Sequence, residues 1–328
     1  MKILPLKTLT LLGSAALMAQ SSFGATILYS DNFDAGTSAS GWTAVQSHAN
    51  SFANFAYDYS TLGVPSAPNS LGGSTIGMNF LANQSAGVQQ GISASPNGQS
   101  FTGDFTIRFD MWLNYNGPVG NPPAAPGGSG STQVGSFGWG TSGASAQWAG
   151  ASSSIMFGAD GDGGSTFDYR VYRNNALLSP TTGVYAAGTT TSPSSLDARN
   201  NSNPFYTALF GGQAAPAAQL GLFPGQTGVT DPGALGFKWR DVVVQKAGTI
   251  LTWTVDGNLL ATVDSTGATL SGNNILFGIF DINASSSTDV NDHLITAIYD
   301  NIVVSVPEPS SLALVGLSGL ALLARRRK

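Results

Sequence analysis

The stretch from Asp104 to Tyr115 reads DFTIRFDMWLNY, and it decides the fold class of the chain. Every second residue in it is apolar, in the order Phe105, Ile107, Phe109, Met111 and Leu113. This period of two predicts a β-strand with one face in a core, because a helix would scatter these side chains around its circumference.

A β-hairpin is predicted around Asp256-Gly257, which separates two apolar runs at residues 249–255 and 258–263. Both central residues of a type I′ turn need positive φ, and Asp-Gly is a preferred pair for it. Residues 116–130 and 178–233 are rich in Pro, Gly and small residues and predict two long loops. Further strands are predicted over residues 26–29, 52–59, 75–81, 153–158, 166–173, 236–246, 274–281 and 294–305.

The composition favours strands and loops over long helices. Charged residues make up only 9% of the chain, 42 of its 328 residues are Gly, and it has no Cys. The absence of Cys excludes disulfides, zinc-thiolate sites and cysteine nucleophiles. We expect an all-β chain with one antiparallel jelly-roll or β-sandwich domain over residues 25–305, carrying long Gly/Pro-rich loops. Two subdomains divided by those loops are the alternative.

The charge of the central region limits its partners. The chain has 13 Lys+Arg and 18 Asp+Glu, of which the two ends hold 6 and 1, which leaves 7 − 17 = −10. This negative field repels nucleic acid and anionic membranes, so nucleic-acid binding is excluded as a function. It is compatible with neutral glycans and with calcium.

The first 24 residues have the pattern of a secretory signal peptide. Two lysines precede an apolar stretch over residues 9–18, and the small residues Ser22 and Gly24 stand before a cleavage point at Ala25. The apolar helix is too short to span a bilayer comfortably. We therefore expect export through the general secretion machinery, with a buried helix as the alternative.

The last segment, residues 306–328, has three parts in a fixed order. Its motif is Val306, Pro307, Glu308 and Pro309. An apolar run over residues 311–324 follows, and the chain closes with Arg325, Arg326, Arg327 and Lys328. The prolines cannot continue a strand, and a basic cluster holds the end of a short membrane helix on the cytoplasmic side.

This segment resembles the PEP-CTERM sorting signal of Gram-negative bacteria. The resemblance implies recognition by exosortase, a membrane protease-transpeptidase that would cut near the Pro-Glu-Pro motif. The precursor would be held transiently in the inner membrane and then pass to the cell surface or the extracellular space. A tail anchor that is never cut is the alternative.

Four short stretches suggest a fold family. LYSDNFD at residues 28–34, the strand of residues 105–113, LTWTVDG at 251–257 and YDNIVVS at 299–305 are similar to laminin-G/concanavalin-like jelly rolls. The resemblance implies a fold but no single function, since this fold hosts lectins, hydrolases, lyases and adhesion modules.

Catalytic chemistry finds little support in the residues. Glycoside hydrolysis usually needs two carboxylates, and residues 25–305 contain no Glu, because Glu308 lies in the tail. Paired aspartates remain an option, but no tight acidic motif stands on a predicted strand. His48 and His293 have no accompanying nucleophile motif. We therefore predict a protein that is not an enzyme.

Two groups of aspartates are candidate structural calcium sites. Asp160 and Asp162 alternate with glycines, and Asp168 follows. Such a loop either directs carboxylates at one ion or forms a solvated turn. Asp31 near the first strand and Asp300 in the last strand either clamp a second ion or accept backbone hydrogen bonds.

Trp112 is the candidate ligand-binding residue. It lies on the face of its strand opposite the apolar residues, so its ring could stack on a sugar unless the second long loop covers it. The sequence as a whole favours a non-catalytic lectin-like or adhesive module in an exopolysaccharide or biofilm matrix. A polysaccharide hydrolase or lyase, and a purely structural surface protein without a ligand, are the alternatives.

Overall fold

A computed structural model of the chain describes residues 25–84, 87–115, 133–283 and 292–306. Residues 27–307 form one compact unit. The signal segment of residues 1–24 and the end of the chain from residue 307 lie outside the described part, and so does the membrane helix expected over residues 311–324. No helix among the described residues has the length and apolarity needed to cross a bilayer.

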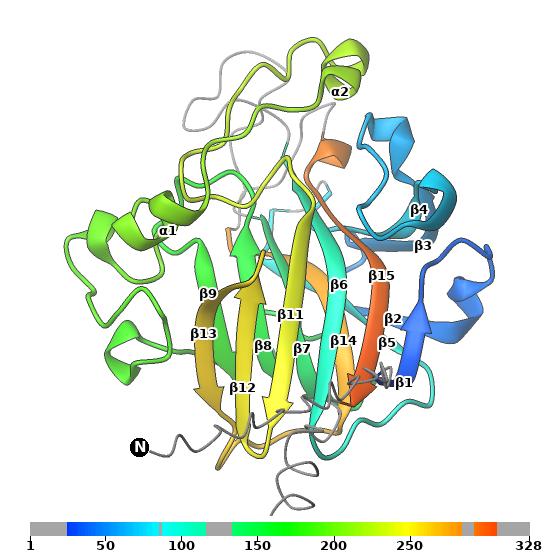
Figure 1. Ribbon diagram of the computed structural model, residues 1–328. Helices are drawn as coiled ribbons and strands as arrows, with labels where there is room; N and C mark the ends of the chain where they lie inside the picture. The colour runs from blue at the N-terminus through cyan, green and yellow to red at the C-terminus, as the bar shows by residue number, and fades with distance from the viewer. Residues whose placement is uncertain (1–24, 85–86, 116–132, 284–291, 307–328) are drawn as a thin grey trace, which may run out of the picture. The chain divides into compact units, whose positions relative to one another are not determined.

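Two antiparallel sheets form a β-sandwich, which confirms the predicted fold class (Figure 1). Sheet A has the order β13 (Asn258–Asp264), β12 (Ile250–Val255), β11 (Arg240–Ala247), β6 (Phe105–Asn114), β15 (Thr296–Val306), β4 (Ile76–Leu81) and β3 (Phe52–Asp58), with β1 (Thr26–Asp31) beside β15. Sheet B has the order β10 (Ala176–Leu177), β9 (Tyr169–Arg173), β8 (Ile155–Asp160), β7 (Gln133–Thr141), β14 (Asn274–Asp281), β5 (Gln90–Pro96) and β2 (Trp42–Gln46).

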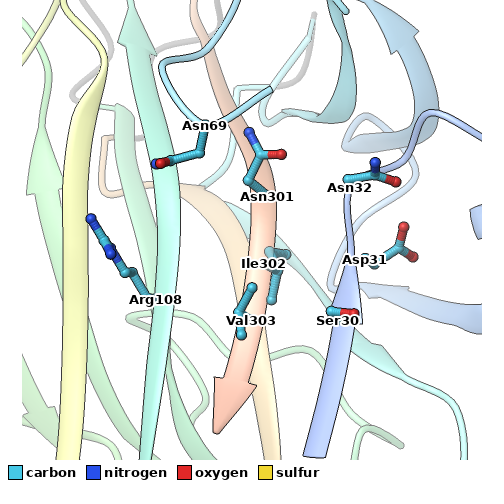
Figure 2. Close-up of a pocket in the computed structure, with 8 residues that line it drawn as sticks. All are labelled: Ser30, Asp31, Asn32, Asn69, Arg108, Asn301, Ile302 and Val303. Carbon is cyan, nitrogen blue, oxygen red and sulfur yellow. The ribbon is translucent and has the colours of Figure 1, made fainter. Parts of the chain in front are cut away.

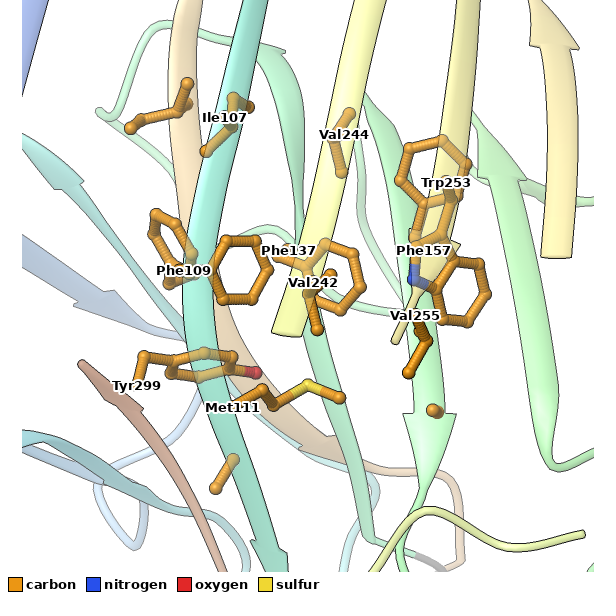
Figure 3. Close-up of a cluster of buried hydrophobic side chains, with 14 of the residues drawn as sticks. Ile107, Phe109, Met111, Phe137, Phe157, Val242, Val244, Trp253, Val255 and Tyr299 are labelled. Atoms are coloured by element: carbon orange, nitrogen blue, oxygen red, sulfur yellow. The ribbon is translucent and has the colours of Figure 1, made fainter. Parts of the chain in front are cut away.

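The apolar face of β6 fills the space between the sheets, as its alternation predicts (Figure 3). The ring of Phe109 lies 5.0 Å from that of Phe137 on β7 and 4.9 Å from that of Phe277 on β14, both edge to face. Tyr299 on β15 crosses the same space, and its hydroxyl donates to the carbonyl oxygen of Gly278 at 2.8 Å. These contacts tie the two sheets together in the core.

The hairpin is confirmed between β12 and β13. Asp256 and Gly257 have φ values of 50° and 78°, the positive values that a type I′ turn needs. The first and last predicted strands are also neighbours, because β1 pairs with β15.

The second predicted loop, residues 178–233, is ordered and closes an edge of sheet A. Its backbone pairs with β13, with Ala186 N donating to Leu260 O at 2.9 Å and Thr262 N donating to Val184 O at 2.8 Å. An edge strand covered in this way cannot pair with another chain. The loop contains the short helices α1 (Pro204–Leu209) and α2 (Ala217–Leu222). Short 3₁₀ turns occur at Ser38–Gly41, Tyr59–Leu62, Leu71–Gly73, Pro180–Thr182, Ser194–Leu196 and Asp292–Leu294.

Candidate functional site

Two aspartates face each other on neighbouring strands at the outer face of sheet A. Asp110 on β6 is the direct partner of Asp300 on β15, and both side chains are fully buried. The main-chain N–H and Nδ2 of Asn69 donate to the Asp110 carboxylate at 3.2 and 2.8 Å, and Nδ2 of Asn301 donates to it at 2.9 Å. Three donors therefore satisfy a carboxylate that has no access to water.

The Asp300 carboxylate has donors of its own. The Tyr59 hydroxyl donates to it at 3.0 Å, Ser70 Oγ at 2.9 Å and the main-chain N–H of Asn301 at 2.7 Å. Burial nevertheless raises the pKa of Asp300 to about 7, because the charged form loses its hydration. Burial also raises the pKa of Asp110, while hydrogen bonds from Asn301 and Asn69 oppose that rise.

Above this pair lies an open polar depression of about 460 Å³ (Figure 2). The end of β1 forms one wall and Arg108 on β6 lies at the other side, with β15 between them. Pairing between β15 and β6 shifts register between Asp300 and Val303, and Asn301 takes a positive φ of 54° there. This bulge re-aims a side chain out of the sheet. The lining residues are Ser30, Asp31, Asn32, Asn69, Arg108, Asn301, Ile302 and Val303.

The predicted pair of Asp31 and Asp300 comes from neighbouring strands, but each carboxylate serves different donors. Asp31 accepts hydrogen bonds from Trp42 Nε1 at 2.9 Å and from Ser38 Oγ at 2.8 Å. These bonds hold the first strand against the core. Both carboxylates accept hydrogen bonds from the protein, as one of the two hypotheses expects, and calcium binding by this pair stays a prediction.

Asp160, Asp162 and Asp168 lie in or beside the turn between β8 and β9. The Asp160 carboxylate accepts from the main-chain N–H of Asp162 at 3.0 Å and of Gly163 at 3.1 Å. The Asp168 carboxylate accepts main-chain N–H groups as well, from Asn201 at 2.7 Å and from a residue of the turn at 3.1 Å. These bonds are those of a tight turn built by aspartates.

The same turn places several acidic residues near one another. Burial raises the pKa of Asp162 well above its ordinary value, and the neighbouring Asp160 adds to the rise. Burial and the charge of Asp160 raise the pKa of Asp168 in the same way. In the described part of the chain, no three histidine or acidic side chains are grouped as ligands of one metal ion. Calcium binding at this turn stays a prediction, since coordination there would need main-chain oxygens or water as well.

Trp112 lies on the outer face of sheet A, as its periodicity predicts, but its expected exposure is wrong. Only 1% of its surface reaches solvent. Its ring lies 5.7 Å from that of Trp239, and its Nε1 donates to Asn114 Oδ1 at 3.0 Å. Tyr59, Leu62 and Ala215 pack in the same buried cluster, and Ala215 belongs to residues 178–233, so the second long loop helps to cover the ring, as the alternative allowed. A sugar cannot stack on it.

Asn69, Asn301 and Arg108 line the depression, and sequence reasoning missed all three. One signal was available for Asn301, because asparagine adopts positive φ more readily than most residues and the Asp-Asn pair interrupts an apolar strand. Asn69 lies in a loop whose approach to β6 depends on tertiary packing.

Comparisons with known proteins identify the end of the chain. Residues 305–328 match the family model described as the PEP-CTERM protein-sorting motif. The chain therefore ends in a sorting signal of the exosortase kind, which implies export. No curated protein sequence matches the chain.

Solved structures similar to this chain include proteins of several activities. A protein of unknown function with a galectin-like fold from Bacillus subtilis is 8% identical, with 85% of this chain and 96% of that chain covered and a TM-score of 0.39. The potassium-bound carbohydrate recognition domain of Emp46p is 10% identical, with 84% and 96% covered and a TM-score of 0.39. An alginate lyase of polysaccharide lyase family 7 is 11% identical, with 65% and 68% covered and a TM-score of 0.31. No activity is transferred from these structures to this chain.

Proposed function

We propose that this protein is displayed on the cell surface or released into the extracellular matrix, where its β-sandwich serves as a non-catalytic, lectin-like or adhesive module in exopolysaccharide. The match of residues 305–328 to the sorting motif is the observation that carries the proposal. Exosortase would be its processing partner, and the inner membrane would hold the precursor only until the tail is cut.

The carboxylates of sheet A support a role without catalysis. A general acid must reach the proton it transfers, within hydrogen-bond distance or through one water. Asp110 and Asp300 are both fully buried, and protein donors already occupy their oxygen atoms. Glu, the residue that most often serves as the acid, is absent from residues 25–305.

An enzyme acting on polysaccharide is the second candidate. One observation favours it: Asp300, with a pKa raised to about 7, lies directly opposite a second carboxylate. Glycosidases usually carry two carboxyl groups, one of which acts as a general acid. Detectable release of reducing ends or unsaturated sugars from matrix glycans by the purified protein would establish this candidate and reject the non-catalytic one.

The sorting step is tested in the producing cells. Replacement of Pro307, Glu308 and Pro309 by alanine should leave the protein in the membrane fraction, whereas the unaltered protein should reach the surface or the medium. Ser310→Ala, one residue past the motif, is the matched control and should be sorted normally. Equal surface delivery of all three proteins would contradict the proposal. Cosedimentation of the exported protein with isolated exopolysaccharide tests the adhesive role, and a purely structural protein would stay in the supernatant.

A further inference from the structure

We infer that the depression on the outer face of sheet A is a binding site for a neutral, hydroxyl-rich saccharide, which is held by the side-chain oxygens of Asn69 and Asn301. The inference rests on the proposed adhesive function and assigns a site and a ligand class to it. The site lies over β15 and between β1 and β6 (Figure 2).

The carboxamide of Asn301 is held in one orientation. Its Nδ2 donates to Asp110 Oδ2 at 2.9 Å and to Ser70 Oγ at 3.0 Å. Both bonds use the nitrogen, so the oxygen Oδ1 must point the other way. Figure 2 shows this oxygen directed toward β1, across the depression. A fixed acceptor of this kind loses little freedom when a ligand binds.

Asn69 is oriented by the same buried carboxylate. Its main-chain N–H and its Nδ2 both donate to Asp110. No hydrogen bond among the described residues uses the side-chain oxygen of Asn69 or of Asn301. Asp110 thus positions two carbonyl oxygens that remain available, and a hydroxyl group is a natural donor for each.

The remaining lining supplies donors and an apolar floor. Arg108 is 57% exposed; its Nε and Nη2 bind Asp241, which leaves Nη1 available. Ser30 is an exposed hydroxyl on the opposite wall. Val303 on β15 offers aliphatic surface between them. Sugar hydroxyls both donate and accept, and they match this mixture of acceptors and donors better than an apolar ligand does.

The charge around the depression selects against acidic sugars. Asp31 lines it, Asp110 and Asp300 lie beneath it, and Asp241 binds the guanidinium of Arg108. The one arginine is already paired with Asp241, so no unpaired positive charge lines the depression for a uronate carboxylate, and Asp31 adds repulsion. The ligand is therefore a neutral saccharide.

The test uses the exported protein purified from the producing cells and four polysaccharide probes: laminarin, dextran and mannan, which are neutral, and alginate, which is anionic. Affinity electrophoresis should show retardation by at least one neutral probe and little by alginate. Asn301→Gly keeps the positive φ and removes the carboxamide, and it should weaken binding at least tenfold. Asn69→Ala should do the same.

Asn174→Gly is the matched control, because Asn174 also has a positive φ, of 57°, but lies in the turn between β9 and β10 on the other sheet. It should bind as the unaltered protein does. If Asn301→Gly fails to fold, the exposed Arg108→Gln replaces it. Unchanged binding in these site variants, or tighter binding of alginate than of every neutral probe, overturns the inference and leaves the adhesive function standing. Absence of binding to exopolysaccharide and to all four probes overturns both.

Discussion

Asp300 lies under the loop that carries Asn69 and Ser70, and its pKa is raised from 3.8 to about 7 because burial removes water from the charged form. The folded protein therefore keeps a proton that the unfolded chain has already released. The unfolded state binds fewer protons between about pH 4 and pH 7, so the free energy of unfolding falls as the pH rises through this window. The shift corresponds to about 4 kcal/mol as an upper bound.

We predict that Asp300→Asn flattens this part of the stability profile, because asparagine does not ionise. Thermal unfolding at pH 4, 5.5 and 7 measures the effect. The midpoint of the unaltered protein should fall by several degrees more than that of the variant. Asp264→Asn is the control: the pKa of this exposed group is lowered, mainly by a hydrogen bond from the main-chain N–H of Thr266, so its removal should not flatten the fall. Parallel profiles for Asp300→Asn and the unaltered protein would contradict the prediction.

The turn at Asp160 and Asp162 is the candidate calcium site. Burial and the neighbouring charge of Asp160 raise the pKa of Asp162 well above its ordinary value, and a bound cation would favour the ionised form of that carboxyl group. We predict that millimolar calcium raises the unfolding temperature of the protein and that a chelator reverses the rise. In the double variant Asp160→Asn, Asp162→Asn calcium should have no effect. A rise that persists in the double variant would assign the ion elsewhere, and no rise in either protein would remove calcium from the account.

At the scale of elements, two strands of sheet B owe their close approach to glycine. A Cβ on Gly138 of β7 would lie 2.1 Å from the carbonyl oxygen of Ile155, and one on Gly278 of β14 would lie 2.2 Å from that of Ile92. Main-chain atoms within a sheet cannot move aside as a flexible side chain can. We predict that Gly138→Ala and Gly278→Ala each lower the free energy of unfolding by roughly 1–3 kcal/mol.

Chemical denaturation measures this loss, and Gly221→Ala is the control. Gly221 lies in α2 with nothing within 4 Å of the position of its Cβ. Alanine is the better helix former, so this variant should be neutral or slightly more stable. Equal changes in the free energy of unfolding for all three variants would show that a Cβ at Gly138 or Gly278 does not force the strands apart.

Small residues also explain which strands could not be predicted from the sequence. β6 could be predicted because large apolar residues alternate along it. The hairpin of β12 and β13 could be predicted because apolar runs flank a turn. β2, β5, β7 and β10 were not predicted. In β7 the residues that alternate with Phe137 and Trp139 include Gly138, and β5 consists mostly of small residues. Apolar and polar positions therefore do not alternate clearly in these strands. Close packing requires these small residues, and close packing is a property of the assembled sandwich.

The candidate site was less predictable than the fold for a similar reason. Periodicity correctly places Trp112 and Asp110 on the outer face of β6, but it cannot say what covers that face. Contacts from Tyr59 and from the loop that holds Asn69 bury them, and these residues are 41 or more positions away in the chain. Sequence spacing carries no information on such contacts.

For the whole molecule, the position of the terminal strands determines what can be removed. β15 is a central strand, paired with β6 and with β4, and Ile302 and Val304 are buried in the core. β1 lies beside β15 but is largely exposed, with only two of its six residues partly covered. Loss of the end of β15 should therefore be far more damaging than loss of the same length from β1.

We predict that the fragment of residues 25–306 unfolds cooperatively at the temperature of the full chain, because the sandwich draws its contacts from within residues 27–307. Two fragments that each lack six more residues separate the terminal strands. Residues 31–306 should still fold, with a lowered midpoint. Residues 25–300 should not, since burial of Ile302 and Val304 alone contributes roughly 3–6 kcal/mol, a large share of the stability of a domain. Circular dichroism during heating gives the measurement. Cooperative unfolding of residues 25–300, or failure of residues 31–306 to fold, would contradict the prediction that the end of β15 contributes more to stability than β1 does.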